Sequence, residues 1–314
     1  MAENTVKKIA TRESYGNSLK ELAEEFPNLV VLDADLAAAT KTGIFRKAYP
    51  DRHIDCGIAE SNMMGVAAGL SLVGKIPFVS SFAMFAAGRA FEQVRNSIGY
   101  PHLNVKIGAT HAGITVGEDG ATHQCNEDIA LMRTIPGMVV MCPSDDVEAR
   151  AAVRAALEYE GPVYIRFGRA AVPVINDHPG YHFEIGKGTV VREGKDVTIV
   201  ATGICVDSAL GAAKMLEEEG ISAEVVNICT IKPLDEEIII NGAKKTGKVV
   251  TVEEHSVIGG LGSAVCDCLC ANHPVPVKKV GMQDVFGESG SAAALVEKYG
   301  LDAKGVYKSV KEFL

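Results

Sequence analysis

Two histidines stand in one short polar segment of the sequence, GATHAGITVGEDGATHQCNED at positions 108–128. The segment follows an apolar run typical of a strand, and loops at the carboxyl ends of strands in α/β sheets are where ligands bind. His111 and His123 can exchange protons near neutral pH, and the glycines between them let the backbone approach a ligand closely. From these residues alone, the alternative is a polar loop whose histidines cap turns.

One carboxylate, Glu60, lies in the otherwise small and apolar run DCGIAESNMMGVAAGLS at 55–71. Apolar positions after it recur at helical spacing, and Ser61 or Asn62 can serve the helix start, which places Glu60 at the mouth of a helix. Glu60 is therefore either a first-turn acid favoured by the helix dipole or a carboxylate kept in an apolar setting for chemistry.

Two aromatic and three cationic residues complete the candidate set. Phe82 and Phe85 are three positions apart, so their rings share one side of a helix or tight turn and can hold a flat heterocycle, with core packing as the alternative. Arg12, Arg166 and Arg169 stand near the ends of expected elements. Each of the three either forms a surface pair or holds a phosphate bidentately.

Two further motifs give weaker signals. Cys266, Cys268 and Cys270 alternate within an expected helix and point to different sides, so small buried apolar residues are a better interpretation than a metal site. The run EEHSVIGGLGSAV, which contains His255, places a glycine-rich turn before a helix. That turn either binds an anion at the helix N-terminus or packs closely at a domain or subunit contact, and His255 receives no catalytic role.

Short apolar strands alternate with helices along the first half of the chain. We expect strands at 28–36, 76–82, 105–111, 138–144 and 161–167, and helices at 13–26, after Glu60, and at 88–100, 126–135 and 145–159. This alternation predicts βαβ units, and hence an α/β fold with a mainly parallel sheet flanked by helices.

The alternation lapses at VPVINDHPGYHFEIGKG and then restarts. In the second half we expect strands at 196–202, 222–228, 248–254 and 275–282, and helices at 207–220, 235–247 and 260–272. The sequence therefore predicts two domains, 1–172 and 190–314, joined by a linker at 173–189.

Composition excludes several classes of protein. The net charge of −9 and the lack of a Lys/Arg cluster argue against a nucleic-acid partner. The sequence shows no signal region, and no apolar run approaches the ~20 residues of a membrane span. None of the eight cysteines forms a CxxC motif. Unpaired thiols suit a reducing compartment, so we expect a cytoplasmic protein.

Four consecutive blocks resemble the transketolase family over almost the whole chain. They are TRESYGNSLKELAEEFPNLVVLDADL, DCGIAESNMMGVAAGL, SSFAMFAAGRAFEQVRNSI and ATHAGITVGEDGATHQCNEDIALMRTIPGMVV. The run ATH…GEDGATHQ is the specific element. Oxoacid dehydrogenase β subunits share the AE helix but carry a different loop, and deoxyxylulose-phosphate synthases have a similar DGxTHQ but usually lack the earlier histidine. The resemblance implies a pyrimidine-binding domain at 1–172 and the family's C-terminal domain at 190–314.

The resemblance also implies how thiamine diphosphate is held. Glu60 occupies the position of the glutamate that hydrogen-bonds N1′ of the aminopyrimidine ring and so favours the tautomer that activates the cofactor. Phe82 and Phe85 match the aromatic pair that packs around this ring. Asp35, in DADL, matches an aspartate near the cofactor at the subunit interface.

For the substrate, His111 and His123 match the two histidines of the family's substrate channel, where they stabilise oxyanions and exchange protons. Asp119 matches the aspartate that binds a sugar hydroxyl. The phosphate end of sugar phosphates is held at the positions of Arg12, His111 and Arg169. Ala39 stands where the family has a serine, which removes one phosphate hydrogen bond.

Part of the family pattern is missing. The diphosphate is held through a divalent metal (Mg²⁺, with Ca²⁺ or Mn²⁺ as alternatives) by a GDG motif and a later Asn on a preceding domain, and this sequence has no GDG. The start at Met1 directly before the pyrimidine domain favours a two-gene arrangement. We therefore expect a C-terminal subunit that self-associates and joins an N-terminal transketolase subunit in an α2β2 heterotetramer, with the metal on that partner.

The reaction implied by the resemblance is the reversible transfer of a two-carbon ketol unit from a ketose phosphate to an aldose phosphate, as in the pentose phosphate pathway. Three alternatives remain. The chain is a component like 1-deoxy-D-xylulose-5-phosphate synthase, a component like the oxoacid dehydrogenase E1 β subunit, or a partner subunit without catalysis.

Overall fold

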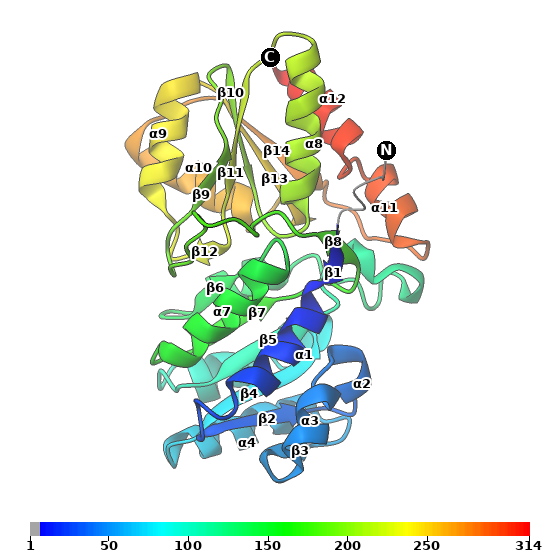
Figure 1. Cartoon of the computed structure of the whole chain (residues 1–314), viewed down its shortest axis with the longest axis vertical. Helices are drawn as coiled ribbons and strands as arrows, with labels where there is room; N and C mark the ends of the chain where they lie inside the picture. The colour runs from blue at the N-terminus through cyan, green and yellow to red at the C-terminus, as the bar shows by residue number, and fades with distance from the viewer. Residues whose placement is uncertain (1–6) are drawn as a thin grey trace.

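The computed structural model describes residues 7–314 and contains two α/β domains stacked along the long axis of the molecule (Figure 1). The lower domain is built on a seven-stranded sheet in the order β12-β6-β7-β5-β4-β2-β3. Its strands are β2 (Leu29–Asp33), β3 (His53–Asp55), β4 (Ile76–Phe82), β5 (Lys106–Thr110), β6 (Val139–Met141), β7 (Val163–Arg166) and β12 (Thr230–Lys232). All neighbours are parallel except β12 and β6, so the predicted mainly parallel sheet is confirmed.

Helices cover both faces of this sheet. Residues of α1 (Thr11–Leu22), α3 (Gly43–Ala48) and α7 (Asp146–Glu158) share a core with one face. The other face is covered by α4 (Glu60–Leu72), η2 (Met84–Arg89), α5 (Phe91–Gln93), η3 (Val94–Gly99) and α6 (Asp128–Arg133). Because both faces are covered, central strands such as β2 are buried at every residue. Shorter elements are α2 (Ala37–Thr40) and the 3-10 turns η1 (Pro50–Arg52) and η4 (Ile114–Asp119).

The segment expected as one α-helix at 88–100 has a different winding. Both η2 and η3 are π-helical, and only the short α5 between them is α-helical. The N–H of Ala90 donates to Phe85 O, and that of Tyr100 donates to Arg95 O, five residues back in each case. Apolar periodicity does not distinguish these windings, and π turns recur at functional sites.

The second domain has a five-stranded sheet in the order β14-β13-β10-β11-β9. Its strands are β9 (Thr189–Arg192), β10 (Val197–Ala201), β11 (Ala223–Asn227), β13 (Val249–Ser256) and β14 (Val277–Met282), all parallel except β9. Residues of α8 (Cys205–Glu218), α11 (Ala292–Lys298) and α12 (Ala303–Phe313) share a core with one face. The other face meets α9 (Glu236–Thr246) and α10 (Leu261–Asn272).

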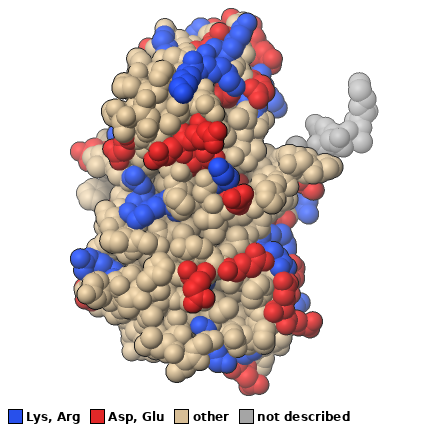
Figure 2. All heavy atoms as spheres, turned by 90° about the vertical axis from the view of Figure 1, so that its left-hand side faces the viewer, with Lys and Arg blue, Asp and Glu red and all other residues tan. Residues whose placement is uncertain are grey.

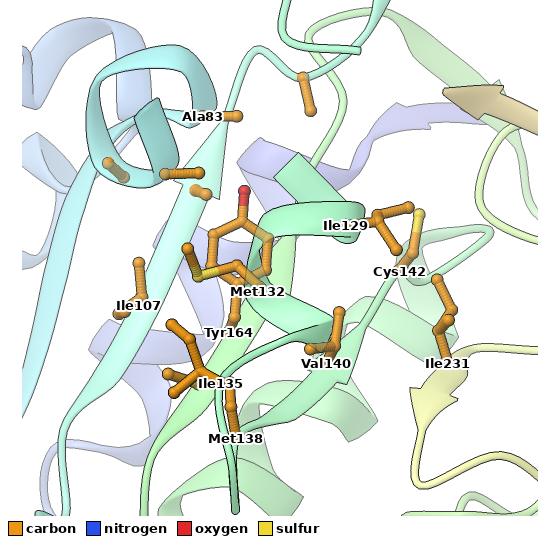
Figure 3. Close-up of a cluster of buried hydrophobic side chains, with 14 of the residues drawn as sticks. Ala83, Ile107, Ile129, Met132, Ile135, Met138, Val140, Cys142, Tyr164 and Ile231 are labelled. Atoms are coloured by element: carbon orange, nitrogen blue, oxygen red, sulfur yellow. The ribbon is translucent and has the colours of Figure 1, made fainter. Parts of the chain in front are cut away.

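The two domains share structure that the sequence analysis did not foresee. The strand β12 comes from the second half of the chain but pairs antiparallel with β6 at the edge of the first sheet. Figure 3 shows Ile231 of β12 beside Cys142, next to the core side chains Val140 and Ile129. One buried cluster runs from the first domain through these residues into the second.

The segment between the domains is attached rather than free. Strand β8 (Ala171–Pro173) pairs antiparallel with β1 (Lys8–Ala10). Farther along, the N–H groups of Ile175 and Asn176 both donate to Asp145 at 2.7 Å. The boundaries 1–172, 173–189 and 190–314 stay a prediction.

Charged residues of both signs alternate on the face shown in Figure 2, where a large uncharged area covers much of the lower domain. Among residues 7–314, none of the helices combines the length and the apolar character needed to cross a bilayer.

Candidate active site

The candidate residues converge at one edge of the first sheet because the carboxyl ends of parallel strands meet there. Phe82 is the last residue of β4, His111 directly follows β5, and Arg169 follows β7 by three positions. Glu60 begins α4 after the loop that leaves β3, and Arg12 lies in the first turn of α1.

Glu60 is buried, with only 2% of its surface exposed, and it is ion-paired. The Arg89 Nη1 donates to both carboxylate oxygens of Glu60 at 3.0 Å. The helix begins at Glu60 itself after an Ala59 N-cap without a side-chain bond, so the expectation of a start at Ser61 or Asn62 is wrong. The expected apolar setting is also only half right, because a guanidinium on the sequence-distant η2 covers the carboxylate.

The two phenylalanines lie in parallel, as their spacing predicts. The rings of Phe82 and Phe85 stack with centroids 5.8 Å apart at 15°. His111 stacks on Phe82 at 3.9 Å, and His123 meets the edge of Phe85 at 5.4 Å. Arg89 lies 4.5 Å above the Phe85 ring, so one continuous chain of contacts links the buried carboxylate to both histidines.

His111 is held as a neutral acceptor. Arg12 Nη1 lies 3.2 Å from its Nε2, and the Thr110 hydroxyl lies 2.9 Å from its Nδ1. Because Arg12 can only donate, Nε2 accepts and the proton sits on Nδ1. Burial lowers the pKa of His111 to about 3, and the charges of Arg12 and Arg169 and the neighbouring His123 act in the same direction.

The cations of the predicted phosphate end lie close together. Arg12 Nη1 also donates to Ala39 O at 2.8 Å, so the alanine that replaces the family's serine anchors this arginine through its backbone. Burial lowers the pKa of Arg12, and the charge of Arg169 lowers it further. Arg169 donates to Val116 O and pairs with Glu118 at 3.2 Å.

Two predicted residues lie apart from this cluster. Asp35 is exposed at the end of β2, has a φ of +60°, and donates its N–H to Asp55 at 3.0 Å. Asp119 is exposed at the end of η4, in the loop that also carries His123. The structure thus brings Glu60, Phe82, Phe85, His111, His123, Arg12 and Arg169 together and leaves Asp35 and Asp119 on the surface of the same edge.

Arg166 does not hold a phosphate, although the sequence left that open. It is buried and donates through Nε to Asp128 at 2.9 Å and through Nη2 to Glu254 O at 2.7 Å. Burying a cation in this way requires a paired anion, and Asp128 supplies it. These contacts of Arg166 are all with buried groups of the protein itself.

The glycine-rich turn before α10 already has an anion of its own. Glu253 accepts the N–H groups of Leu261 at 2.7 Å and Gly262 at 2.8 Å. These are the groups that an exogenous anion would use, so the anion-site alternative is wrong. His255 is fully buried, donates from Nδ1 to Ser256 O at 2.7 Å, and accepts the Ala130 N–H at 3.3 Å, which makes it a contact between the domains.

The cysteine run is split between environments. Cys268 is buried, Cys266 is half-buried and Cys270 is exposed. The prediction that the three side chains point to different sides is therefore confirmed. The interpretation as small buried apolar residues fits only Cys268. Within residues 7–314, no group of three or more His, Cys, Asp or Glu side chains is arranged to hold a metal ion.

Sequence reasoning missed Arg89. Its signal was present, because Arg89 follows Phe85 by four positions in the same quoted block, and a buried carboxylate in an apolar run needs a cationic or hydrogen-bonding partner.

Comparison with known proteins defines the family. The description "Transketolase, pyrimidine binding domain" matches residues 7–174, and "Transketolase, C-terminal domain" matches residues 186–306. The chain belongs to the transketolase family, whose members depend on thiamine diphosphate. It comprises the pyrimidine-binding and C-terminal domains and is a transketolase subunit.

Relatives of similar length support this assignment. The chain is 49% identical to the 6-deoxy-6-sulfo-D-fructose transketolase subunit SqwH of a Clostridium species, over 96% of this chain and 93% of the relative. It is 40% identical to one of the subunits of an apulose-4-phosphate transketolase from Phocaeicola vulgatus, over 98% of each chain. A solved structure described as a split gene transketolase, inactive beta4 tetramer, superimposes with a TM-score of 0.89 at 58% identity and 98% coverage of both chains.

Proposed function

We propose that this subunit supplies the pyrimidine pocket and the substrate channel of a two-subunit transketolase that moves a two-carbon ketol unit between sugar phosphates. The observation that carries the proposal is the unbroken contact chain from Glu60 through Arg89, Phe85 and Phe82 to His111. A buried carboxyl group that can share a proton, next to aromatic rings that can pack against a heterocycle, suits an aminopyrimidine.

The residues present fit the pyrimidine part of thiamine diphosphate. Glu60 is the buried carboxylate that would share a proton with the ring, and Phe82 and Phe85 would pack against the ring's faces or edges. Asp35, on the same sheet edge, is the proposed contact near the cofactor at the subunit interface. When bound, thiamine diphosphate supplies the carbanion chemistry that cleaves and forms carbon–carbon bonds.

The substrate's anionic end would bind where Arg12, His111 and Arg169 meet. Arg12 has a buried Nε without a hydrogen-bond partner in the described structure, so the fold does not use the whole hydrogen-bonding capacity of its guanidinium. The Nε2 of His111 is an acceptor here, so His111 would stabilise an oxyanion only after Arg12 turns to the substrate and the imidazole tautomer changes. His123 would exchange protons, and the exposed Asp119 would accept a sugar hydroxyl.

The relatives widen the class of substrate. One similar subunit is named for a sulfo-sugar and another for a sugar phosphate. Sulfonate and phosphate are both tetrahedral oxyanions that a guanidinium pair can hold. We therefore propose that Arg12 and Arg169 bind the anionic end of the sugar substrate. A comparison of phosphorylated, sulfonated and uncharged ketoses as ketol donors would show which anion the site prefers.

The remaining parts of the proposal concern the partner. A divalent ion such as Mg²⁺ and the diphosphate would be held mainly by an N-terminal subunit, giving an α2β2 assembly in which this chain also contacts its own copy. All eight cysteines are free in the structure, which favours a cytoplasmic location.

Reconstitution tests the proposal. The purified chain, given thiamine diphosphate, Mg²⁺ and a ketose phosphate with an aldose phosphate, is expected to show no ketol transfer. The same chain mixed with the N-terminal subunit from its host is expected to show it. Transfer by the isolated chain would refute the two-subunit scheme, and decarboxylation of pyruvate by the complex would favour the synthase or dehydrogenase alternatives.

The substitution Glu60→Ala tests the central residue. Its partner Arg89 is 51% exposed and becomes solvated when the carboxylate is removed, so the fold should persist with an unchanged circular dichroism spectrum. Turnover by the reconstituted complex should fall by roughly a hundredfold or more, because the proton-sharing carboxyl is lost. Near-normal turnover would remove Glu60 from this role.

A further inference from the structure

The polar loop at 112–125 carries two of the proposed substrate residues, Asp119 and His123. Its neck is closed by backbone contacts, since Ala112 and Cys125 form a β-bridge and the Gly113 N–H donates to Cys125 O at 2.9 Å. The backbone between these ends forms only the short η4 turn. Within the loop, Gln124 Nε2 donates to Ile114 O and Gly117 O at 3.3 and 3.4 Å, and Arg169 of the first domain donates to Val116 O. Contacts from the second domain act beside these bonds.

One contact comes from the second domain. Glu254 lies on β13, is 2% exposed, and accepts the Thr115 N–H through Oε1 at 2.7 Å. Its carboxylate also touches Gly113, where an added Cβ would stand 2.3 Å from the Glu254 Cδ. The φ of Gly113 is +74°, a conformation that glycine adopts readily, so this loop path and this close approach both depend on glycine.

Arg166 fixes the carboxylate in turn. Its Nη1 lies 3.7 Å from Glu254 Oε2, and its Nη2 donates to Glu254 O and to Cys125 O at 2.7 and 3.3 Å. The same guanidinium is paired with Asp128 at the start of α6. One buried group therefore connects β13 of the second domain with the end of the loop and with the helix that follows it.

A second contact supports the outer part of the loop. Gln124 Nε2 donates to Glu288 O at 2.9 Å, in the segment of the second domain that precedes α11. A Cβ added at Gly120 would stand 2.4 Å from the hydroxyl of Ser289. The loop thus contacts the second domain near both of its ends. Among the residues of the second domain that make these contacts, Glu254 is the buried carboxylate.

We propose that Glu254 is a positioning residue of the ketol-transfer site, through which the second domain holds the loop that carries Asp119 and His123. Glu254 reaches the loop backbone and not the substrate, so its effect passes through the loop. The inference rests on the proposed function for its kinetic consequence, but its structural part concerns only contacts within this chain.

The test compares Glu254→Ala and Glu254→Gln with the control Glu253→Gln. Glu253 is the adjacent residue of β13 and is equally buried, but its carboxylate accepts from Leu261 and Gly262 at the start of α10 instead of from the loop. Loss of either carboxylate costs stability, so only an effect on the loop separates the two positions.

Hydrogen exchange of the peptide that covers 112–125, measured on the isolated chain, is the first readout. Glu254→Ala is expected to speed exchange at Thr115 by about tenfold or more, because a buried N–H loses its charged acceptor. Glu254→Gln keeps an oxygen for that N–H and should retain part of the protection. Glu253→Gln should lower the melting temperature and leave exchange in the loop unchanged.

Kinetics of the reconstituted complex is the second readout. Glu254→Ala should lower kcat/KM for the sugar substrates by about tenfold or more, whereas the affinity for thiamine diphosphate should change less than about twofold because Glu60, Phe82 and Phe85 lie outside the loop. Unchanged exchange and unchanged kcat/KM in both Glu254 variants would overturn the inference. A wild-type complex without ketol transfer would instead refute the proposed function, and the exchange experiment would still decide the role of Glu254.

Discussion

At the scale of single residues, the pair of Glu60 and Arg89 lies at the proposed pyrimidine pocket and would govern access to it. The carboxylate is buried while its partner is half exposed, so Arg89 can turn into water, but Glu60 then needs another partner, which a ring nitrogen would supply. A ring nitrogen that hydrogen-bonds Glu60 must displace or share Arg89. The guanidinium also lies over Phe85, so its movement would uncover an aromatic face at the same time.

Replacing Arg89 tests this competition. We expect Arg89→Met to bind thiamine diphosphate as tightly as the wild type or up to about fivefold more tightly, because the ring would no longer have to displace the half-exposed Arg89 from the carboxylate. The affinity would be measured by calorimetry on the reconstituted complex. Arg95→Met is the matched control, since Arg95 is an exposed arginine of the neighbouring η3 that bonds to the adjacent Asn96. Binding weakened tenfold in Arg89→Met would mean that Arg89 helps to hold the cofactor instead.

Residue types and spacing predicted much of the candidate site but not its ion pairs. The stacking of Phe82 on Phe85 followed from their separation of three positions. By contrast, Arg166 was as plausible a phosphate ligand as Arg12 in the sequence, because nothing local reveals that Asp128 and Glu254 would enclose it. Long-range pairing of buried charges is set by how the elements pack, and sequence patterns do not report it.

At the scale of elements, the strands of the parallel sheets were the most predictable part, because buried strands are continuous apolar runs. The short strand β12 was missed because its three residues carry no periodicity and its partner β6 belongs to the other domain. The π-helical winding of η2 and η3 was also missed, since apolar spacing does not distinguish it from an α-helix.

The buried Lys106, at the start of β5, leads to a prediction of how the stability of the fold depends on pH. Its ammonium donates to Tyr159 O at 2.7 Å and Gly161 O at 2.6 Å, between α7 and β7. Burial lowers the pKa of Lys106 to about 7, against 10.5 in an exposed lysine. Between these values the unfolded chain binds more protons than the folded chain, so the contribution of Lys106 to stability rises as the pH increases.

The measurement compares unfolding free energies of the wild type and Lys106→Met in denaturant from pH 7 to pH 10. From pH 7 to pH 10 the unfolding free energy of the wild type should rise by about 1–3 kcal/mol relative to that of the variant. Taking the difference removes the titration of the buried cysteines, which both proteins share. The exposed Lys278 of β14 provides the control, and Lys278→Met should show a constant difference. A constant difference for Lys106→Met would show that Lys106 stays charged in the fold.

At the scale of the whole molecule, the two domains are less separate than the change in sequence pattern suggests. The second half of the chain supplies β12 to the first sheet, Glu254 to the polar loop, and His255 and the turn before α10 to contacts with α6. The shared core includes Cys142 and Ile231, which come from opposite sides of the expected linker. The second half of the chain therefore completes surfaces of the first domain.

This interdependence predicts that cutting the chain in the expected linker does not yield two independent domains. A fragment of residues 1–188 would lose β12 and expose the edge of β6, and it would bury Arg166 without the backbone and carboxylate of Glu254. We expect this fragment alone to aggregate or to melt at least about 10 °C below the intact chain, because several buried contacts worth more than about 1 kcal/mol each are removed together. Coexpression with a fragment of residues 189–314 should restore a soluble complex, as judged by gel filtration and thermal denaturation. If residues 1–188 alone were monomeric and melted like the intact chain, the first domain would fold without the second. The first domain would then depend on the second only for the position of the polar loop.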